Sequence, residues 1–347
     1  MDPIEVFLRN ALAQKGVEDR ATRAALKRLR PVMAQIRLLM QDSGVLQLRP
    51  DRERLIAAVT GRAAQIIAQE WGQPALAQFQ EALGPYLETQ TQFARDMVES
   101  AGGTLSSPGA VAPSSVVATQ QALVGGRPLA DQMVLGIPAQ AAERLAQFIR
   151  ISTGVEPGEV LARYENAVVR KVENTISATI TSGVQATGDL YQMAVYQLEA
   201  DPAWLEGKLQ WTATLDSRTC PVCVALDGKE YTFGQAATGF DGQNKIDLHF
   251  QCRCYLVPMK WRKDGNERIV DGDDGERALN FRRSAKVWVR ENPETAREIF
   301  GATIGSRLVG SWPDNAWGRR QFEIHKGPPD VISFNKALKI WQSPAPD

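Results

Sequence analysis

Two short runs, 216-DSRTCPVC-223 and 249-HFQCRC-254, contain all four cysteines of this 347-residue chain and one of its two histidines. The first run has the spacing C-x-x-C, and the second contains H-x-x-C. Zinc prefers thiolate and imidazole ligands, and structural zinc sites commonly receive them as two short pairs from separate turns. The spacing therefore predicts a structural zinc site. Its four predicted ligands are Cys220, Cys223, His249 and Cys252.

Other arrangements of the same side chains stay open. Residues two apart in a strand face the same side, so Cys254 either replaces Cys252 as a ligand or is buried beside the site. Two disulfides, or four buried thiols, would also account for the cysteines, although disulfides are rare in a reducing compartment. A catalytic zinc is disfavoured because it requires an open position for water, which four protein ligands would fill.

The residues around the cysteines are typical of short strands. The run 208-KLQWTATL-215 alternates polar and apolar residues, as a half-buried strand does. The run 227-DGKEYTF-233 indicates a turn followed by a second strand, and 253-RCYLVPM-259 indicates a third. We expect Trp211 in the core of this unit. Because so small a unit has little core, a bound metal would contribute directly to its folding.

Helical periodicity dominates the chain before this unit. Apolar residues recur at helical spacing over 53–71 and over 165–194, where they are Val172, Ile176, Ile180, Val184 and Tyr191. The many Thr and Ser of the second segment are mediocre helix formers, so packing has to hold that helix. Pro31 is predicted to start or kink a helix, and the pair 84-GP-85 to break one.

These patterns predict an α+β protein that is mainly α-helical, with helical modules flanking a small β-rich zinc-binding unit. Residues 102–125 carry no charge and are rich in Gly, Ser, Ala and Pro, which is typical of a linker or of an arm that lies along a partner. The predicted segments are an N-terminal helical domain over 1–101, a charge-free linker or arm over 102–127, a helical lead-in over 128–204, the β-rich unit over 205–260 and a basic, partly helical C-terminal region over 261–347.

Composition excludes several classes of protein. Forty basic residues balance forty acidic ones, so net charge gives no pointer to nucleic acid or to an anionic membrane. Four cysteines are too few for a disulfide-built secreted scaffold. The N-terminal residues Asp2 and Glu5 stand where a signal peptide carries Lys or Arg, and no apolar run approaches the roughly 20 residues needed to cross a bilayer. We therefore expect a soluble protein made in a reducing cytoplasm.

The order of residues around the cysteines resembles the signature of a known family. The run 211-WTATLDSRTCPVCVALDGKEYTF-233 contains Trp, Asp, Thr-Cys-x-x-Cys and Asp-Gly in that order, and 249-HFQCRCYLVP-258 contains His-x-x-Cys-Arg-Cys and ends at Pro. This order is similar to that of tailed-phage minor head proteins, the Mu protein F-like head-morphogenesis family. The resemblance covers about residues 130–258. The chain departs from the pattern at Phe250, where the family usually has proline.

The resemblance implies a non-enzymatic structural protein of the virion. Such a minor capsid protein is made in the host cytoplasm and lies in the phage head interior or at the portal vertex. It acts in head morphogenesis and in DNA packaging or delivery, and its implied partners are the portal protein and the major capsid or scaffold protein, with no membrane. The alternative is a zinc-supported nuclease acting in packaging. Replacing His249 separates the two, because it should damage folding in the first case and only activity in the second.

Asp216 and Arg253 are hypothesised to support the ligands. Asp216 lies four residues before Cys220, and Arg253 lies between the last two cysteines. A carboxylate that accepts a turn amide or the guanidinium would fix how the two ligand pairs meet. The alternative is that Asp216 only caps a turn and that Arg253 is solvated.

A basic segment follows an acidic loop predicted over 264–276. Its basic residues would contact packaged DNA or an acidic portal surface, or they form the solvated face of a helix whose inward residues are Leu279, Val287 and Val289. The basic residues are Arg277, Arg282, Arg283, Lys286 and Arg290.

Overall fold

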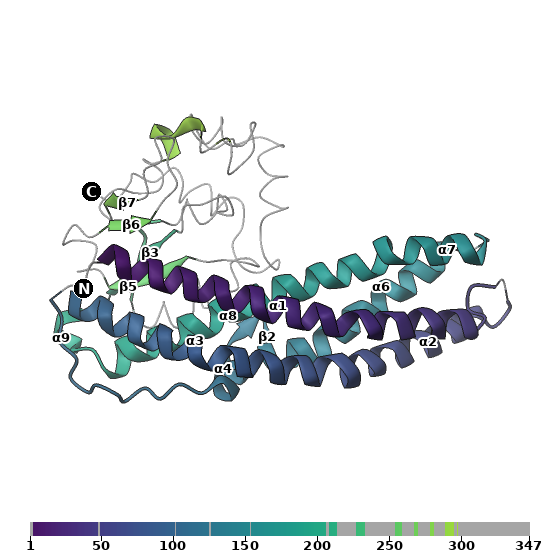
Figure 1. Ribbon diagram of the computed structural model, residues 1–347, viewed down its shortest axis with the longest axis horizontal. Helices are drawn as coiled ribbons and strands as arrows, with labels where there is room; N and C mark the ends of the chain where they lie inside the picture. Colours follow the sequence, from purple (N-terminus) through teal and green to yellow (C-terminus); the bar gives the residue numbers. More distant parts are fainter. Residues whose placement is uncertain are drawn as a thin grey trace. The chain divides into compact units, whose positions relative to one another are not determined.

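The computed structural model describes most of the first two thirds of the chain and parts of the rest. The described residues are 3–47, 49–100, 102–124, 126–152, 154–205, 208–213, 227–232, 254–258, 267–269, 278–280, 289–294 and 297. Within them the protein is mainly helical with a few short strands, as the sequence predicted (Figure 1). None of the described helices is both long enough and apolar enough to span a membrane.

The helical elements occupy the chain up to Leu205. They are α1 (Pro3–Asp42), α2 (Arg52–Ile66), the π-helical turn η1 (Ile67–Gly72), α3 (Gln73–Ser100), α4 (Ser115–Gln121), α5 (Leu129–Asp131), the π-helical turn η2 (Gln132–Gly136), α6 (Ile137–Ile151), α7 (Pro157–Tyr164), the π-helical turn η3 (Glu165–Val169), α8 (Arg170–Leu198) and α9 (Pro202–Leu205). A short hairpin lies between α4 and α5. Its strands are β1 (Leu123–Val124) and β2 (Arg127–Pro128).

Contacts divide the chain into two compact parts. The sheet part comprises Met1–Gln14, Pro85–Ser114 and Gln185–Asp347, and the bundle part comprises Lys15–Gly84 and Ser115–Val184. Helices α1, α3 and α8 therefore contribute residues to both parts. Each part also draws residues from both sides of the charge-free segment.

The bundle part is held by apolar stripes and by a few side chains that bond to helix carbonyls. In the helix predicted over 53–71, Val59, Ala63, Ile67 and Trp71 are buried, which confirms its apolar face. The Trp71 indole Nε1 donates a hydrogen bond to the Ala25 carbonyl at 2.9 Å. Helix α2 packs along α6, where the Arg52 guanidinium donates to the Ile149 carbonyl at 2.6 Å (Figure 1).

Two prolines lie inside continuous helices. The prediction that 84-GP-85 breaks a helix was wrong, because α3 runs through Pro85, and no helix begins at Pro31, which lies inside α1. A proline inside a helix removes one hydrogen bond. Both rings are exposed, so the carbonyls left without a partner can face water. Buried apolar residues on either side, such as Leu83 and Leu87 in α3, offset the cost.

Helix α8 is the most buried helix that the structure describes. The predicted stripe is confirmed, because Val172, Ile176, Ile180, Val184 and Tyr191 are all buried. In addition, every residue of the block Thr181–Asp189 is buried, whichever face of the helix it occupies. A Cβ atom on Gly188 would lie 2.6 Å from the Tyr86 hydroxyl, so glycine permits a close approach there. Packing holds this Thr- and Ser-rich helix, as predicted.

The three strands predicted around the cysteines form one antiparallel sheet. They are β3 (Lys208–Thr212), β4 (Glu230–Thr232) and β5 (Tyr255–Pro258), in the order β4-β3-β5. Trp211 is fully buried, which confirms its place in the core. All three strands lie in the sheet part.

The acidic and basic segments after residue 260 contain strands that the sequence did not reveal. Strand β6 (Glu267–Ile269) pairs antiparallel with β7 (Ala278–Asn280). The loop predicted over 264–276 and the helical face predicted through Leu279 were therefore wrong at these residues. Among the predicted basic contacts, Arg290 is described and exposed, whereas Arg277, Arg282, Arg283 and Lys286 lie outside the described residues.

Candidate functional site

The predicted zinc ligands lie in two segments outside the described residues. Segment 214–226 carries Cys220, Cys223 and the supporting Asp216, and segment 233–253 carries His249, Cys252 and Arg253. The alternative ligand Cys254 is described, and it is buried immediately before β5.

The sheet topology places three of the four described residues that flank these two segments at one end of the sheet, and the fourth, Thr232, pairs with Lys208 at the opposite end. Strand β3 runs antiparallel to both neighbours, so its carboxyl end lies beside the amino ends of β4 and β5. The register shows this directly, because Gln210 pairs with Glu230 and Thr212 pairs with Tyr255.

Three residues consequently stand at the same end of the sheet. Ala213 follows β3 and is where segment 214–226 leaves the sheet, and Asp227 is where that segment returns. Cys254 is where segment 233–253 returns. The segment with the first predicted ligand pair is therefore attached to this end of the sheet on both sides, and the second pair is attached to it through Cys254.

Asp227 closes the first of these segments at its base. Its Oδ1 accepts a hydrogen bond from the Ala213 amide at 2.8 Å. The Gly228 amide donates to the Trp211 carbonyl at 2.9 Å, and Gly228 has a φ of 84°, a conformation that favours glycine. The Asp-Gly pair signalled the turn in the sequence. The hydrogen bond of Asp227 depends on the strand register and could not be found that way.

We expect Asp227→Ala to destabilise the sheet part by about 1–3 kcal/mol, because the buried Ala213 amide would lose its acceptor. Asp227→Asn is the matched control, because it retains an acceptor oxygen and should cost less. The free energy of unfolding from urea titrations of the full chain measures both. Equal stability of the alanine variant and the unaltered protein would contradict this role.

Gln185 ties the start of β5 to helix α8. Its Nε2 donates to the Cys254 carbonyl at 3.3 Å and to Asp189 Oδ1 at 3.0 Å, and its Oε1 accepts from Gln14 Nε2 at 2.9 Å. All four residues are buried. The Gln185 amide thus holds Cys254 in place, and Cys254 comes directly after Arg253 and the second predicted ligand pair. Nothing in the sequence around a single helical glutamine indicates this contact.

A second chain of buried amides links three helices of the sheet part. Gln192 Nε2 on α8 donates to Gln90 Oε1 on α3 at 2.5 Å, and Gln90 Nε2 donates to Asn10 Oδ1 on α1. Leaving one of these groups without a partner costs about 1–3 kcal/mol. The amides therefore favour one register of the helices over shifted alternatives.

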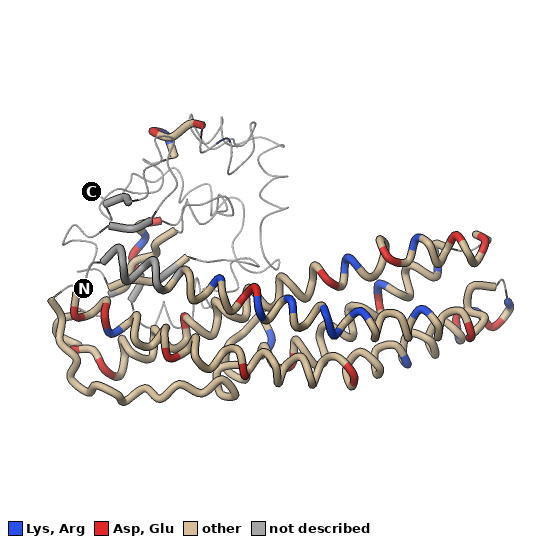
Figure 2. Tube along the Cα trace, in the orientation of Figure 1, with Lys and Arg blue, Asp and Glu red and all other residues tan. Residues whose placement is uncertain are grey.

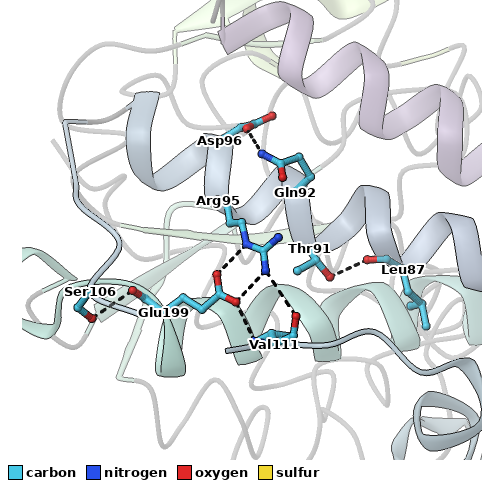
Figure 3. A network of polar contacts seen from close by, with 8 residues as sticks. All are labelled: Leu87, Thr91, Gln92, Arg95, Asp96, Ser106, Val111 and Glu199. Atoms are coloured by element: carbon cyan, nitrogen blue, oxygen red, sulfur yellow. Dashed lines mark hydrogen bonds and ion pairs between the residues drawn. The ribbon is translucent and has the colours of Figure 1, made fainter. Parts of the chain in front are cut away.

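An ion pair between a fully buried glutamate and a partly buried arginine lies at the carboxyl end of α8. The Glu199 side chain is fully buried, and its two carboxylate oxygens contact the Arg95 guanidinium at 2.7 and 2.8 Å (Figure 3). Glu199 Oε1 also accepts a hydrogen bond from the Val111 amide at 2.8 Å. Hydrogen bonds between the two charged groups lower the pKa of Glu199 and raise the pKa of Arg95.

The same glutamate anchors the charge-free segment. Its main-chain carbonyl accepts a hydrogen bond from the Ser106 amide at 2.7 Å, and Leu105 forms an antiparallel bridge with Ala200. We call residues 104–111 the strap, because they run along the end of α8 without forming a helix (Figure 3). The segment predicted as a linker or arm over 102–127 thus begins with this strap and continues into α4 and the β1–β2 hairpin.

Among the described residues, no three His, Cys, Asp or Glu side chains gather closely enough to hold a metal ion. Comparisons with protein families, with curated proteins and with solved structures found no match to this chain.

Proposed function

We propose that the protein is a structural minor head protein of a tailed phage whose β-rich unit is held together by a zinc ion. It would be non-enzymatic and would lie in the virion, in the head interior or at the portal vertex. Its partners would be the portal protein and the major capsid or scaffold protein, and it would act in head morphogenesis and in DNA packaging or delivery. The resemblance of the cysteine signature to that of tailed-phage minor head proteins supports this proposal.

One structural observation supports the zinc part of the proposal. The sheet places Ala213 and Asp227, which flank segment 214–226, and Cys254, which follows segment 233–253, at one end of its strands. Thiolates and an imidazole are a donor set that suits zinc. Strands β3, β4 and β5 have only five, three and four residues, so an ion that crosslinks the two segments would contribute directly to folding.

Specific residues would hold and support the ion. Cys220, Cys223, His249 and Cys252 would be its ligands, with Cys254 as the alternative to Cys252, and Asp216 and Arg253 would orient them. When bound, the zinc would supply a structural crosslink.

The test is the metal content of the purified full chain, with each candidate ligand replaced in turn. We expect about one zinc ion per chain, lost when Cys220 or Cys223 is replaced by serine. The pair Cys252→Ser and Cys254→Ser is internally matched, because only one of the two should lose the metal. A metal-free protein, or cysteines joined as disulfides in reducing buffer, would contradict the zinc site.

His249→Ala separates a structural role from a catalytic one. We expect this variant to lose zinc and to unfold at a lower urea concentration than the unaltered protein. A His249→Ala protein that keeps its fold and its zinc, but loses cleavage of DNA shown by the unaltered protein, would replace this proposal with a nuclease.

A further inference from the structure

Helix α1 carries a long run of one charge sign. Between Arg20 and Gln41 it has six basic residues and no acidic residue. Five of the six are exposed. Successive members of these five lie three, four, three and seven positions apart in the sequence, so they share one face of the helix. We call them the α1 stripe: Arg20, Arg23, Lys27, Arg30 and Arg37.

The α1 stripe lies on the solvent side of the bundle part. The opposite face of the helix is buried in the core through Ala21, Ala25, Leu29, Val32 and Ile36. The sixth basic residue, Arg28, is only partly exposed and donates from Nε to Gln78 Oε1 at 3.5 Å. Figure 2 shows basic residues recurring along α1 through this run.

The charges of the α1 stripe are not neutralised by neighbours. Within the described part of the chain, none of its five cations has a carboxylate oxygen within 4.0 Å. Other exposed cations of the bundle part do, because Arg150 pairs with Glu53 at 3.1 Å and Arg163 pairs with Glu159. Asp19, which precedes the stripe, pairs with Lys15 at 3.5 Å. Ordinary surface helices intersperse both signs, so this face attracts an extended anion.

We propose that the α1 stripe binds the phosphate backbone of duplex DNA. Four of its five cations are arginines, whose planar guanidinium groups bind phosphate oxygens through two parallel hydrogen bonds. Successive stripe residues from Arg20 to Arg30 lie about 5 Å apart along the helix axis, Arg37 lies about 10 Å beyond Arg30, and the whole stripe spans about 25 Å. Phosphates of one strand recur about every 3.4 Å along a duplex, so several of them lie within reach.

The other side chains of this face favour duplex DNA over other anionic partners. Protein interfaces centre on aromatic and apolar anchors, and single-stranded nucleic acids stack their bases on aromatic rings. None of the other exposed residues on this face is aromatic, and Leu38 is the one large apolar side chain among them, which is no cluster of anchors. They are Asp19, Pro31, Ala34, Leu38 and Gln41. Such a face recognises the charge and spacing of the phosphates and does not distinguish base sequences. The inference does not depend on the zinc site, because every residue that carries it lies in α1.

The test compares two five-residue variants of the full chain. The stripe variant replaces all five residues of the α1 stripe by glutamine, a good helix former. The matched control replaces five other exposed arginines of the bundle part by glutamine and so loses the same charge. These are Arg54, Arg62, Arg150, Arg163 and Arg170. Binding to a fluorescent duplex of random sequence is measured by anisotropy at several salt concentrations, with circular dichroism to check the helix content of each variant.

If all five cations contact phosphates, a fourfold rise in salt should weaken binding of the unaltered protein by about 500-fold. The stripe variant should bind at least about 100-fold more weakly at low salt and lose most of this dependence, whereas the control should stay within about fivefold of the unaltered protein. The smaller variant Lys27→Gln/Arg30→Gln should reduce the salt slope by about two and serves if the stripe variant misfolds.

Three results would overturn the proposal. One is a stripe variant that binds duplex DNA as tightly as the control does. Another is tighter binding of single-stranded DNA than of the duplex. The third is polyglutamate binding to the unaltered protein with the affinity and salt dependence of the duplex, which would make the α1 stripe a docking face for acidic protein.

Discussion

Replacing Arg95 by alanine is expected to lower the free energy of unfolding of the sheet part by about 3–5 kcal/mol, because it leaves a buried carboxylate without its counter-charge. The Glu199 side chain is fully buried and bonds to Arg95 through both oxygens. Urea unfolding of the full chain, followed by circular dichroism, measures the loss. Arg150→Ala is the matched control, because its partner Glu53 is exposed, and it should cost less than about 1 kcal/mol.

The pH dependence of the same pair gives a second measurement. Arg95 holds the pKa of folded Glu199 below its ordinary value of 4.5, so the pair contributes its full stability above about pH 4.5. That contribution is lost as the pH falls through the lowered pKa, because the carboxylate becomes protonated. Glu199→Gln has no charge to titrate there, so its stability deficit should shrink on acidification. A deficit that stays constant would show that the charge contributes nothing.

Trp71→Ala is expected to destabilise the bundle part by about 3–5 kcal/mol, because it empties a large fully buried site. The indole also donates to the Ala25 carbonyl at 2.9 Å, which joins η1 to α1. Trp71→Phe keeps an aromatic ring and loses the hydrogen bond, so it should cost about 1–2 kcal/mol. Denaturant unfolding midpoints rank the variants.

The control for this site is Leu135→Ala, since the Leu135 side chain is 61% exposed. It should change stability by less than about 0.5 kcal/mol. If Trp71→Ala and Leu135→Ala cost the same, the tryptophan would not be the core residue that its burial indicates.

Local patterns in the sequence predicted the elements of the fold well. Polar–apolar alternation over 208–215 and the Asp-Gly turn at Asp227 located two of the three sheet strands, because both signals depend only on neighbouring residues. The apolar stripe from Val172 to Tyr191 likewise located the buried face of α8.

Contacts between residues far apart in the chain could not be predicted in the same way. Glutamate and arginine are common on the surfaces of helices, so the sequence does not single out Glu199 or Arg95. Only the folded structure shows that their side chains meet. Gln185 reaches the Cys254 carbonyl for the same reason. Pro85 misled the prediction because burial of the apolar side chains in the turns around it outweighs the cost of about 3 kcal/mol for one proline inside a helix.

The sequence predicted one part of the candidate site, and only the fold shows the other part. Sequence spacing alone predicted the ligands Cys220, Cys223, His249 and Cys252, and these four residues lie outside the described part of the chain. The structure adds one end of a sheet, where segment 214–226 leaves and returns and segment 233–253 returns. It also adds an aspartate that closes the first segment and a glutamine that holds the residue after the second. Neither Asp227 nor Gln185 belongs to any ligand spacing, so only the fold could identify them.

The complete burial of Thr181–Asp189 limits how this protein can diverge. Most helices leave a solvent face on which substitutions accumulate at little cost, while only the inner face is constrained. This stretch offers no such face. A larger side chain at any of its nine positions meets packed neighbours, so lasting change there requires compensating change in the surrounding helices.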